Sequence, residues 1–296
     1  MSPLLRSAAA VAALGASALT YATLIERRWY ALRHVTLRGA LRSPGRLRIL
    51  HVSDIHLVPG QEHRLRFLER LGALDHDLVV VTGDLLGAVG AEDLGADALA
   101  PLTGPDRPGV VVLGSNDRFG PVAKPPWRYL TAPADRSPGA PLDTDRLVAR
   151  LATHHYRTLV DETTVLETAA GTVSVGGIDD PHLEPTRLPS AARLQPEDPG
   201  ALLRLGLVHS PYLAALDVLC DAGYDLLLAG HTHGGQIRVP GIGALVDNCD
   251  LPLDQARGAS RHRGRWLHVS AGLGHSRFAP IRFACRPEAT LLELTA

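Results

Sequence analysis

Five short apolar runs, each followed at once by polar or histidine-bearing residues, constrain this 296-residue chain more than any other feature. Continuous apolar runs of this length are typical of buried strands. Helical patterns lie between them, for example over residues 63–74, 144–153 and 211–222, so the sequence predicts a layered α/β fold. The runs and the residues after them are 47–52 before Ser53-Asp54, 78–81 before Thr82-Gly83-Asp84, 110–113 before Gly114-Ser115-Asn116-Asp117, 203–208 before His209, and 226–229 before Gly230-His231-Thr232-His233.

A second sheet is predicted by residues 157–178, where short β-rich pieces alternate with turn residues. We expect antiparallel pairing there, and we expect the final apolar run, 289–294, to close this second sheet. The proline-rich stretch 101–141 predicts an extended loop near the end of the third strand.

The N-terminus carries a candidate membrane segment, because residues 7–25 are nineteen uncharged residues in a row. We interpret residues 1–28 as a hydrophobic anchor, 29–46 as a basic linker, and 47–296 as the globular domain. A cleaved signal peptide and a soluble amphipathic helix are the two alternatives, since the segment is rich in alanine.

The formal net charge of −1 conceals an asymmetry between this flank and the rest of the chain. Seven arginines oppose one glutamate in residues 26–48, so the remaining body is acidic. A basic flank faces the cytoplasm by the positive-inside rule, which predicts a membrane-anchored protein with its body in the cytoplasm. The overall charge argues against a nucleic-acid partner, and the three widely spaced cysteines argue against a disulfide framework.

The polar residues after the runs have the chemistry of metal ligands. Asp54 and His56 are two residues apart, which in an extended segment places both side chains on one face, and His231 and His233 repeat this spacing. Asp84 has two carboxylate oxygens to offer to two ions. Each motif alone is weak, but together, in this order and each after an apolar strand, they are specific.

These motifs resemble those of the calcineurin-like metallophosphoesterases, whose pattern is D-x-H, G-D, G-N-H-D/E, H and G-H-x-H. The sequence looks most like the bacterial membrane-anchored branch related to lipid-precursor (UDP-diacylglucosamine) pyrophosphatases. The resemblance implies a four-layer α-β-β-α sandwich of two mixed sheets, with a dimetal site at the carboxyl ends of the strands. The branch is indicated by Gly177-Ile178-Asp179-Asp180-Pro181, by the run from Gly230 to Ile237, and by Ser270-Ala271-Gly272-Leu273-Gly274.

The resemblance also implies a ligand set and an activity. Two divalent ions, Mn, Fe or Zn, would support hydrolysis of a phosphodiester or pyrophosphate bond by a metal-bridging hydroxide. The substrate would be a phosphorylated small molecule or a lipid-linked compound, and no obligate protein partner is evident. One ion would be held by Asp54, His56, Asp84 and His233, and the other by Asp84, Asn116, His209 and His231. The alternative is a catalytically weakened, membrane-associated scaffold with the same fold.

One departure from the family pattern affects the catalytic residues, since Ser115 and Asn116 stand where the family has asparagine and histidine. With a one-residue shift, Asn116 binds metal and Asp117 takes the place of the histidine. Without the shift, Ser115 is a poor ligand and Asn116 donates a hydrogen bond but no proton. We favour Asn116 as the ligand and take Asn116 and Asp117 as the candidate catalytic residues.

Two further side chains are candidates for substrate binding. Arg118 follows the altered motif and would contact a phosphate, with an exposed salt bridge as the alternative. His182 lies in a glycine- and proline-rich region that is expected near the cleft, and an ordinary surface role is the alternative.

Overall fold

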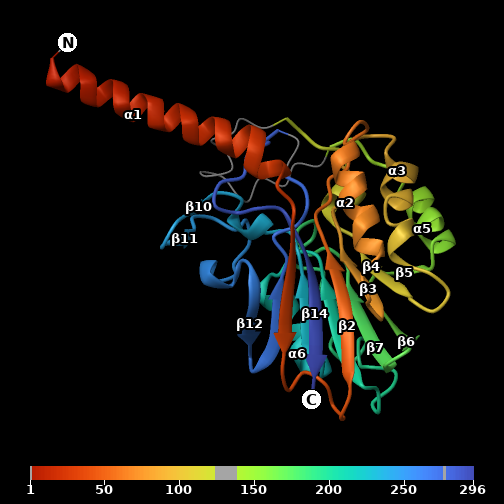
Figure 1. Cartoon of the computed structure of the whole chain (residues 1–296). Coiled ribbons are helices and arrows are strands. Elements are labelled where there is room, and N and C mark those ends of the chain that lie inside the picture. Colours follow the sequence, from red (N-terminus) through yellow and green to blue (C-terminus); the bar gives the residue numbers. More distant parts are fainter. Residues whose placement is uncertain (1, 124–138, 276–277) are drawn as a thin grey trace.

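The computed structural model describes residues 2–123, 139–275 and 278–296 and contains two six-stranded mixed sheets packed face to face (Figure 1). Helices cover the outer face of each sheet, so the predicted four-layer α-β-β-α sandwich is confirmed. Residues 124–138, the centre of the proline-rich stretch, lie outside the described residues.

The first sheet has the strand order β1-β14-β2-β3-β4-β5. Strands β2 to β5 are parallel, β14 runs antiparallel to β2, and β1 is parallel to β14. The strands are β1 (Ala31–Leu37), β2 (Arg46–Val52), β3 (Leu78–Thr82), β4 (Gly109–Val112), β5 (Tyr156–Leu159) and β14 (Glu288–Thr295).

The second sheet has the order β12-β13-β9-β8-β7-β6, with a parallel centre and one antiparallel strand at each edge. Its strands are β6 (Glu162–Thr168), β7 (Gly171–Ile178), β8 (Leu203–Val208), β9 (Leu226–Ala229), β12 (Gly258–His262) and β13 (Arg265–Val269). A separate two-stranded ribbon is formed by β10 (Arg238–Val239) and β11 (Gly243–Ala244).

Three apolar layers hold the sandwich together, and each explains the sequence of the elements around it. The middle layer lies between the sheets, where Ile49 and Val80 of the first sheet belong to the same cluster as Leu205 and Leu228 of the second. One outer layer joins the first sheet to α2 (Glu62–Gly72), α3 (Glu92–Asp97) and α5 (Thr144–Thr153), and the other joins the second sheet to α6 (Leu213–Ala222). Central strands are buried on both faces, which is why they read as continuous apolar runs.

Short helical turns complete the chain. They are η1 (Tyr21–Ile25), η2 (Glu26–Arg28), η3 (Ala100–Leu102), η4 (Ser115–Asp117), η5 (His233–Gly235) and η6 (Leu253–Gln255).

Three expectations about the strands are wrong. The first β-rich piece of 157–178, expected in the second sheet, forms β5 and pairs in parallel with β4 of the first sheet. Residues 29–46 are not a linker throughout, because Ala31–Leu37 form edge strand β1 in register with β14. The final run closes the first sheet rather than the second, since β14 pairs with both β1 and β2. The domain therefore begins before residue 47 and is completed by pairing between the two ends of the chain.

The N-terminal segment projects from the sandwich as α1 (Pro3–Thr20), which buries none of its residues (Figure 1). Within the described residues, the helical stretch Pro3–Arg28 is long and apolar enough to cross a membrane, a property that a signal sequence shares. Its last turns pack on the domain, where Ala22 accepts a hydrogen bond from the backbone of Arg282 and Glu26 accepts two from Ala284 and Cys285.

Candidate metal centre

The predicted ligands come together because the loops after β2, β3, β4, β8 and β9 reach the facing edges of the two sheets. Backbone hydrogen bonds tie these loops to one another. Asp54 donates to the carbonyl of Gly83, His56 donates to that of Asp84, and Gly230 donates to that of His209. The candidate ligands thus lie at the carboxyl ends of parallel strands, where the sequence predicts them.

Five of the candidate ligands have a left-handed backbone conformation, which non-glycine residues seldom adopt. Their φ values are 47° for Asp54, 44° for His56, 55° for Asp84, 68° for His231 and 49° for His233. Strain of this kind persists only where the surrounding structure holds it, and it is concentrated at functional sites. Four of these residues, all except His231, contribute ligand atoms to the close groups described next.

Two groups of side chains have ligand atoms within 4.8 Å of one another, and both groups include Asp54. The first is Asp54, His56 and His233, and the second is Asp54, Asp84 and His209. The Nε2 atoms of His56 and His233 are 3.2 Å apart, and Nε2 of His56 is 3.5 Å from Oδ2 of Asp84. Asp84 therefore belongs to the second group and also lies beside His56 of the first.

His209 shows most directly that the site fits a metal ion. Its Nδ1 atom is 2.6 Å from the carbonyl oxygen of Thr82, which can only accept, so Nδ1 carries a proton and Nε2 is the ring atom left for a ligand. Burial disfavours the charged ring, yet the nearby Asp84 raises the pKa of His209 well above its usual value. That Nε2 atom is fully buried, lies 3.4 Å from Oδ2 of Asp84, and has no hydrogen bond within the described part of the chain. A metal ion that replaced a proton on Nε2 would bind both this nitrogen and the carboxylate.

Burial keeps most of the other imidazoles neutral, which is the form that binds metals. It lowers the pKa of His56 to about 4 and lowers the pKa of His233 well below its usual value. Burial and the nearby Asp84 raise the pKa of Asp117 to about 7, while burial raises that of Asp54 to about 6. Buried carboxylates so close together favour a bound cation.

A directed chain of hydrogen bonds supports Asp54 from between the sheets. Ser53 donates to Oδ2 of Asp54 at 2.6 Å, and Thr82 donates to Ser53 at 2.7 Å. Because the Thr82 hydroxyl proton is used there, Thr82 accepts from Nε2 of His51, 2.9 Å away. Nδ1 of His51 then accepts from Nδ1 of His268, 3.0 Å away. Every donor points toward the carboxylate.

Two glycines leave room for the ligands. A Cβ atom on Gly114 would overlap Oδ1 of Asp84 and lie 2.8 Å from Nε2 of His209. A Cβ atom on Gly230 would overlap the hydroxyl of Ser53 and lie 2.6 Å from Oδ2 of Asp54. Side chains at either position would displace the ligands.

Asp117 does not occupy the place of a proton donor to substrate. Its side chain is fully buried and its carboxylate accepts four backbone N–H groups, those of Asp84, Leu85, Leu86 and Gly114. The expectation that Asp117 replaces the missing histidine is therefore not supported by its position. The side chain positions the backbone that carries Asp84.

Asn116 reaches the candidate site through its backbone and its side chain. The backbone N–H of Asn116 donates to Oδ1 of Asp84, and its side-chain amide lies 2.8 Å from Oδ2 of the same carboxylate. His231 packs beside His209, with ring centres 5.2 Å apart, but belongs to neither close group of ligands.

The two candidate substrate residues lie near the site and are engaged by neighbours. Arg118 donates to Asp179 at 2.7 Å, which is the salt bridge given as its alternative. The ring of His182 lies 4.6 Å from that of His231, and its Nδ1 atom is 3.0 Å from the hydroxyl of Tyr212.

Sequence reasoning missed Arg282, a fully buried arginine behind His233. Its guanidinium group donates to the carbonyls of Ala271 and Gly274 and lies 3.3 Å from Nδ1 of His233. It thereby joins the 271–274 turn to the histidine loop. A lone arginine in a loop has no pattern that would have indicated this role.

With the geometry established, comparison with known proteins identifies the family. The family model for calcineurin-like phosphoesterases matches residues 47–235. The chain belongs to the calcineurin-like phosphoesterase family.

Curated relatives of this calcineurin-like phosphoesterase match over part of their length. Phosphodiesterase YaeI of Escherichia coli is 38% identical over 33% of this chain and 35% of its own. The uncharacterized metallophosphoesterase YkoQ of Bacillus subtilis is 35% identical over 51% of this chain and 54% of its own. The chain thus matches about a third to a half of these relatives.

The chain is also similar in structure to a phosphopantetheinyl hydrolase from Mycobacterium tuberculosis. The superposition covers 80% of this chain and 92% of the hydrolase. The identity is 12% and the TM-score is 0.41, which supports no conclusion about activity.

Proposed function

We propose that this protein is a metal-dependent phosphoesterase that cleaves a phosphodiester or pyrophosphate bond. The observation that carries the proposal is the pair of ligand groups that share Asp54, with the buried Nε2 atom of His209 3.4 Å from Oδ2 of Asp84. Family membership and a relative named as a phosphodiesterase support the same reaction class.

The residues would hold two divalent ions, with Asp54, His56 and His233 on one side and Asp84, Asn116 and His209 on the other. His231 is placed to complete the second set. Such ions, as Mn, Fe or Zn, lower the pKa of bound water and neutralise charge on phosphoryl oxygens. The protein contributes neutral imidazoles, two buried carboxylates and a backbone held by Asp117.

The leaving group is expected to be a good one. Gly114-Ser115-Asn116-Asp117 contains no histidine, and the carboxylate of Asp117 is directed at backbone N–H groups. A positioned general acid contributes about 10²- to 10⁴-fold, and a pyrophosphate or activated diester loses least without one. This agrees with a pyrophosphate in a lipid-linked or nucleotide-linked substrate, as in the UDP-diacylglucosamine branch.

We place the protein at a membrane, with Pro3–Arg28 as the anchor and the catalytic domain on the cytoplasmic side. The length and composition of the helix support the anchor, and the arginines that follow it support the orientation. A reporter fused after residue 296 that is active only outside the cell would contradict this orientation.

The reaction is tested with the full chain, purified in a nonionic detergent and supplied with Mn²⁺. We expect hydrolysis of an aryl phosphodiester, loss of this activity after chelation, and its recovery when Mn²⁺ is restored. Asp84→Asn should lower kcat by at least about 100-fold, because it removes a carboxylate that faces both ligand groups.

The matched control is Asp106→Asn, which changes an exposed aspartate in the turn before β4, at the opposite end of that strand from the site. It should keep wild-type kcat. Protein that holds close to two metal ions per chain, yet is inert toward aryl diesters, monoesters and pyrophosphates, would overturn the proposal. Protein that binds no metal at all would favour the scaffold alternative.

A further inference from the structure

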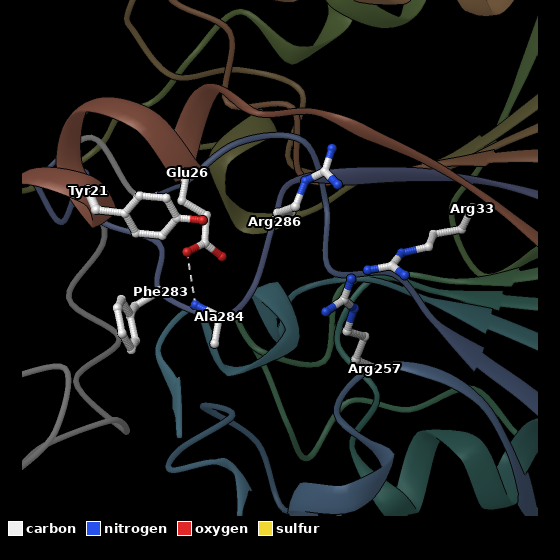
Figure 2. A pocket seen from close by; sticks show the side chains of 7 residues that line it. All are labelled: Tyr21, Glu26, Arg33, Arg257, Phe283, Ala284 and Arg286. Carbon is white, nitrogen blue, oxygen red and sulfur yellow. Dashed lines mark hydrogen bonds between the residues drawn. The ribbon is translucent and has the colours of Figure 1, made fainter. Parts of the chain in front are cut away.

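A pocket of about 370 Å³ lies where the N-terminal helical segment meets the domain (Figure 2). Three arginines contribute to its wall, together with one glutamate and the aromatic rings of Tyr21 and Phe283. The arginines come from separate parts of the chain: Arg33 from β1, Arg257 from the loop before β12, and Arg286 from the segment before β14. The fold therefore concentrates positive charge at this place.

The pocket retains a positive surplus after its internal ion pairs are counted. Glu288, which is not a lining residue, accepts hydrogen bonds from Nε and Nη2 of Arg257 and from Nε of Arg33. The carboxylate of Glu26 accepts hydrogen bonds from the backbone N–H groups of Ala284 and Cys285. Three guanidinium groups thus face two carboxylates, which leaves one positive charge uncompensated.

Donors remain to bind an anion. Within the described residues, the two terminal nitrogens of Arg33 make no hydrogen bond, and neither does Nη1 of Arg257. Arg33 is 48% exposed, and Figure 2 shows its guanidinium group beside that of Arg257. Guanidinium groups bind phosphate oxygens through paired N–H donors, so this arrangement suits a phosphate group.

The surroundings of the pocket are those of a membrane interface. Tyr21 and Glu26 belong to the stretch that is long and apolar enough to span a membrane. Trp29, 52% exposed, lies under the guanidinium group of Arg286 at 4.1 Å. Aromatic rings and arginines are enriched at the level of lipid headgroups.

We infer that this pocket binds the phosphodiester group of an anionic membrane lipid. One such group carries a single negative charge, which matches the surplus of the pocket. The inference rests on the proposed membrane anchor but not on the proposed hydrolysis, because none of the lining residues is a candidate metal ligand. A soluble phosphate has the same recognition chemistry, so the experiment must separate the two sources.

Binding is measured on the full chain in nonionic detergent, after chelator treatment so that phosphate cannot bind at the metal centre. Phosphatidylglycerol, phosphatidylcholine and inorganic phosphate are titrated separately by calorimetry. We expect phosphatidylglycerol to bind, phosphatidylcholine to bind at least about tenfold more weakly, and inorganic phosphate not to compete.

Arg33→Gln is the test variant, because it removes two unused donors while leaving the pair between Arg257 and Glu288. It should weaken phosphatidylglycerol binding about tenfold, and Arg33→Lys should recover part of the loss. Arg46→Gln is the matched control, since Arg46 also pairs with a glutamate of β14, Glu293, but lies outside the pocket. It should bind like the wild type.

Three results would overturn the inference. Inorganic phosphate that binds with the same dependence on Arg33 would show a pocket for soluble phosphate rather than lipid. Equal affinity for the two lipids would exclude recognition of the anionic headgroup, and equal weakening by Arg33→Gln and Arg46→Gln would reduce the effect to overall charge. Hydrolysis of the aryl phosphodiester, assayed in parallel with Mn²⁺, should be the same in Arg33→Gln and wild type.

Discussion

The carboxylate of Asp117 accepts a 2.8 Å hydrogen bond from the backbone N–H of Asp84, and so supports the residue that faces both groups of metal ligands. The same carboxylate binds the N–H groups of Leu85, Leu86 and Gly114. These bonds hold Asp84 at a φ of 55°, a conformation that its own side chain disfavours. The loop after β4 thereby fixes the ligand after β3.

Asp117→Asn should lower kcat and metal affinity by about 10- to 100-fold while the protein stays folded. The amide keeps one acceptor oxygen but turns an NH₂ group toward backbone donors that need an acceptor. Steady-state kinetics across a Mn²⁺ titration measure both effects. Activity that is unchanged at limiting Mn²⁺ would show that Asp84 needs no support from Asp117.

Gly114→Ala should abolish metal binding, because its Cβ atom would overlap Oδ1 of Asp84. Overpacking of this kind costs about 1–3 kcal/mol in stability, and it would displace the side chain of Asp84. The measurement is metal content by elemental analysis, together with the midpoint of unfolding. Gly104→Ala is the control, since a Cβ atom there meets no heavy atom within 4 Å. Full metal occupancy in Gly114→Ala would contradict the geometry.

The sequence predicted the candidate metal ligands better than the parts of the domain around them, and the reason is physical. Ligands such as Asp54 and His209 follow buried strands, and parallel neighbours bring their carboxyl ends together, so local patterns were sufficient. Strand β1 was missed because its arginine and histidine face outward at an edge, and its partner β14 lies at the other end of the chain. Arg282 and the pocket around Arg33 depend on the same distant pairing of chain ends.

The buried pair His51 and His268 should make the protein less stable as the pH falls from about 6.5 to about 4. Burial lowers the pKa of His268 to about 4 and that of His51 well below its usual value. In this range the unfolded chain therefore binds protons that the folded chain does not bind. The free energy of unfolding consequently rises with pH. The depressed pKa of His268 corresponds to about 3 kcal/mol between the two ends of the range.

The test compares urea unfolding of metal-free wild type and of the double variant His51→Gln, His268→Gln between pH 4 and pH 7. The variant should lose stability less steeply as the pH falls. His34→Gln, which changes an exposed histidine of β1, should follow the wild type. Parallel curves for wild type and double variant would show that the buried pair takes no part in the pH dependence.

Catalysis should depend strongly on the leaving group, because the loop from Gly114 to Asp117 provides no imidazole to protonate it. Along a series of methyl phosphodiesters, kcat should fall steeply as the pKa of the departing alcohol rises from nitrophenol to an alkyl alcohol. A general acid would flatten this trend by about 10²- to 10⁴-fold at the poor end of the series. Similar kcat values for the nitrophenyl and alkyl diesters would mean that another group protonates the leaving oxygen. His182, whose ring lies 4.6 Å from that of His231, would then be the first residue to replace, with His182→Gln expected to restore the steep dependence.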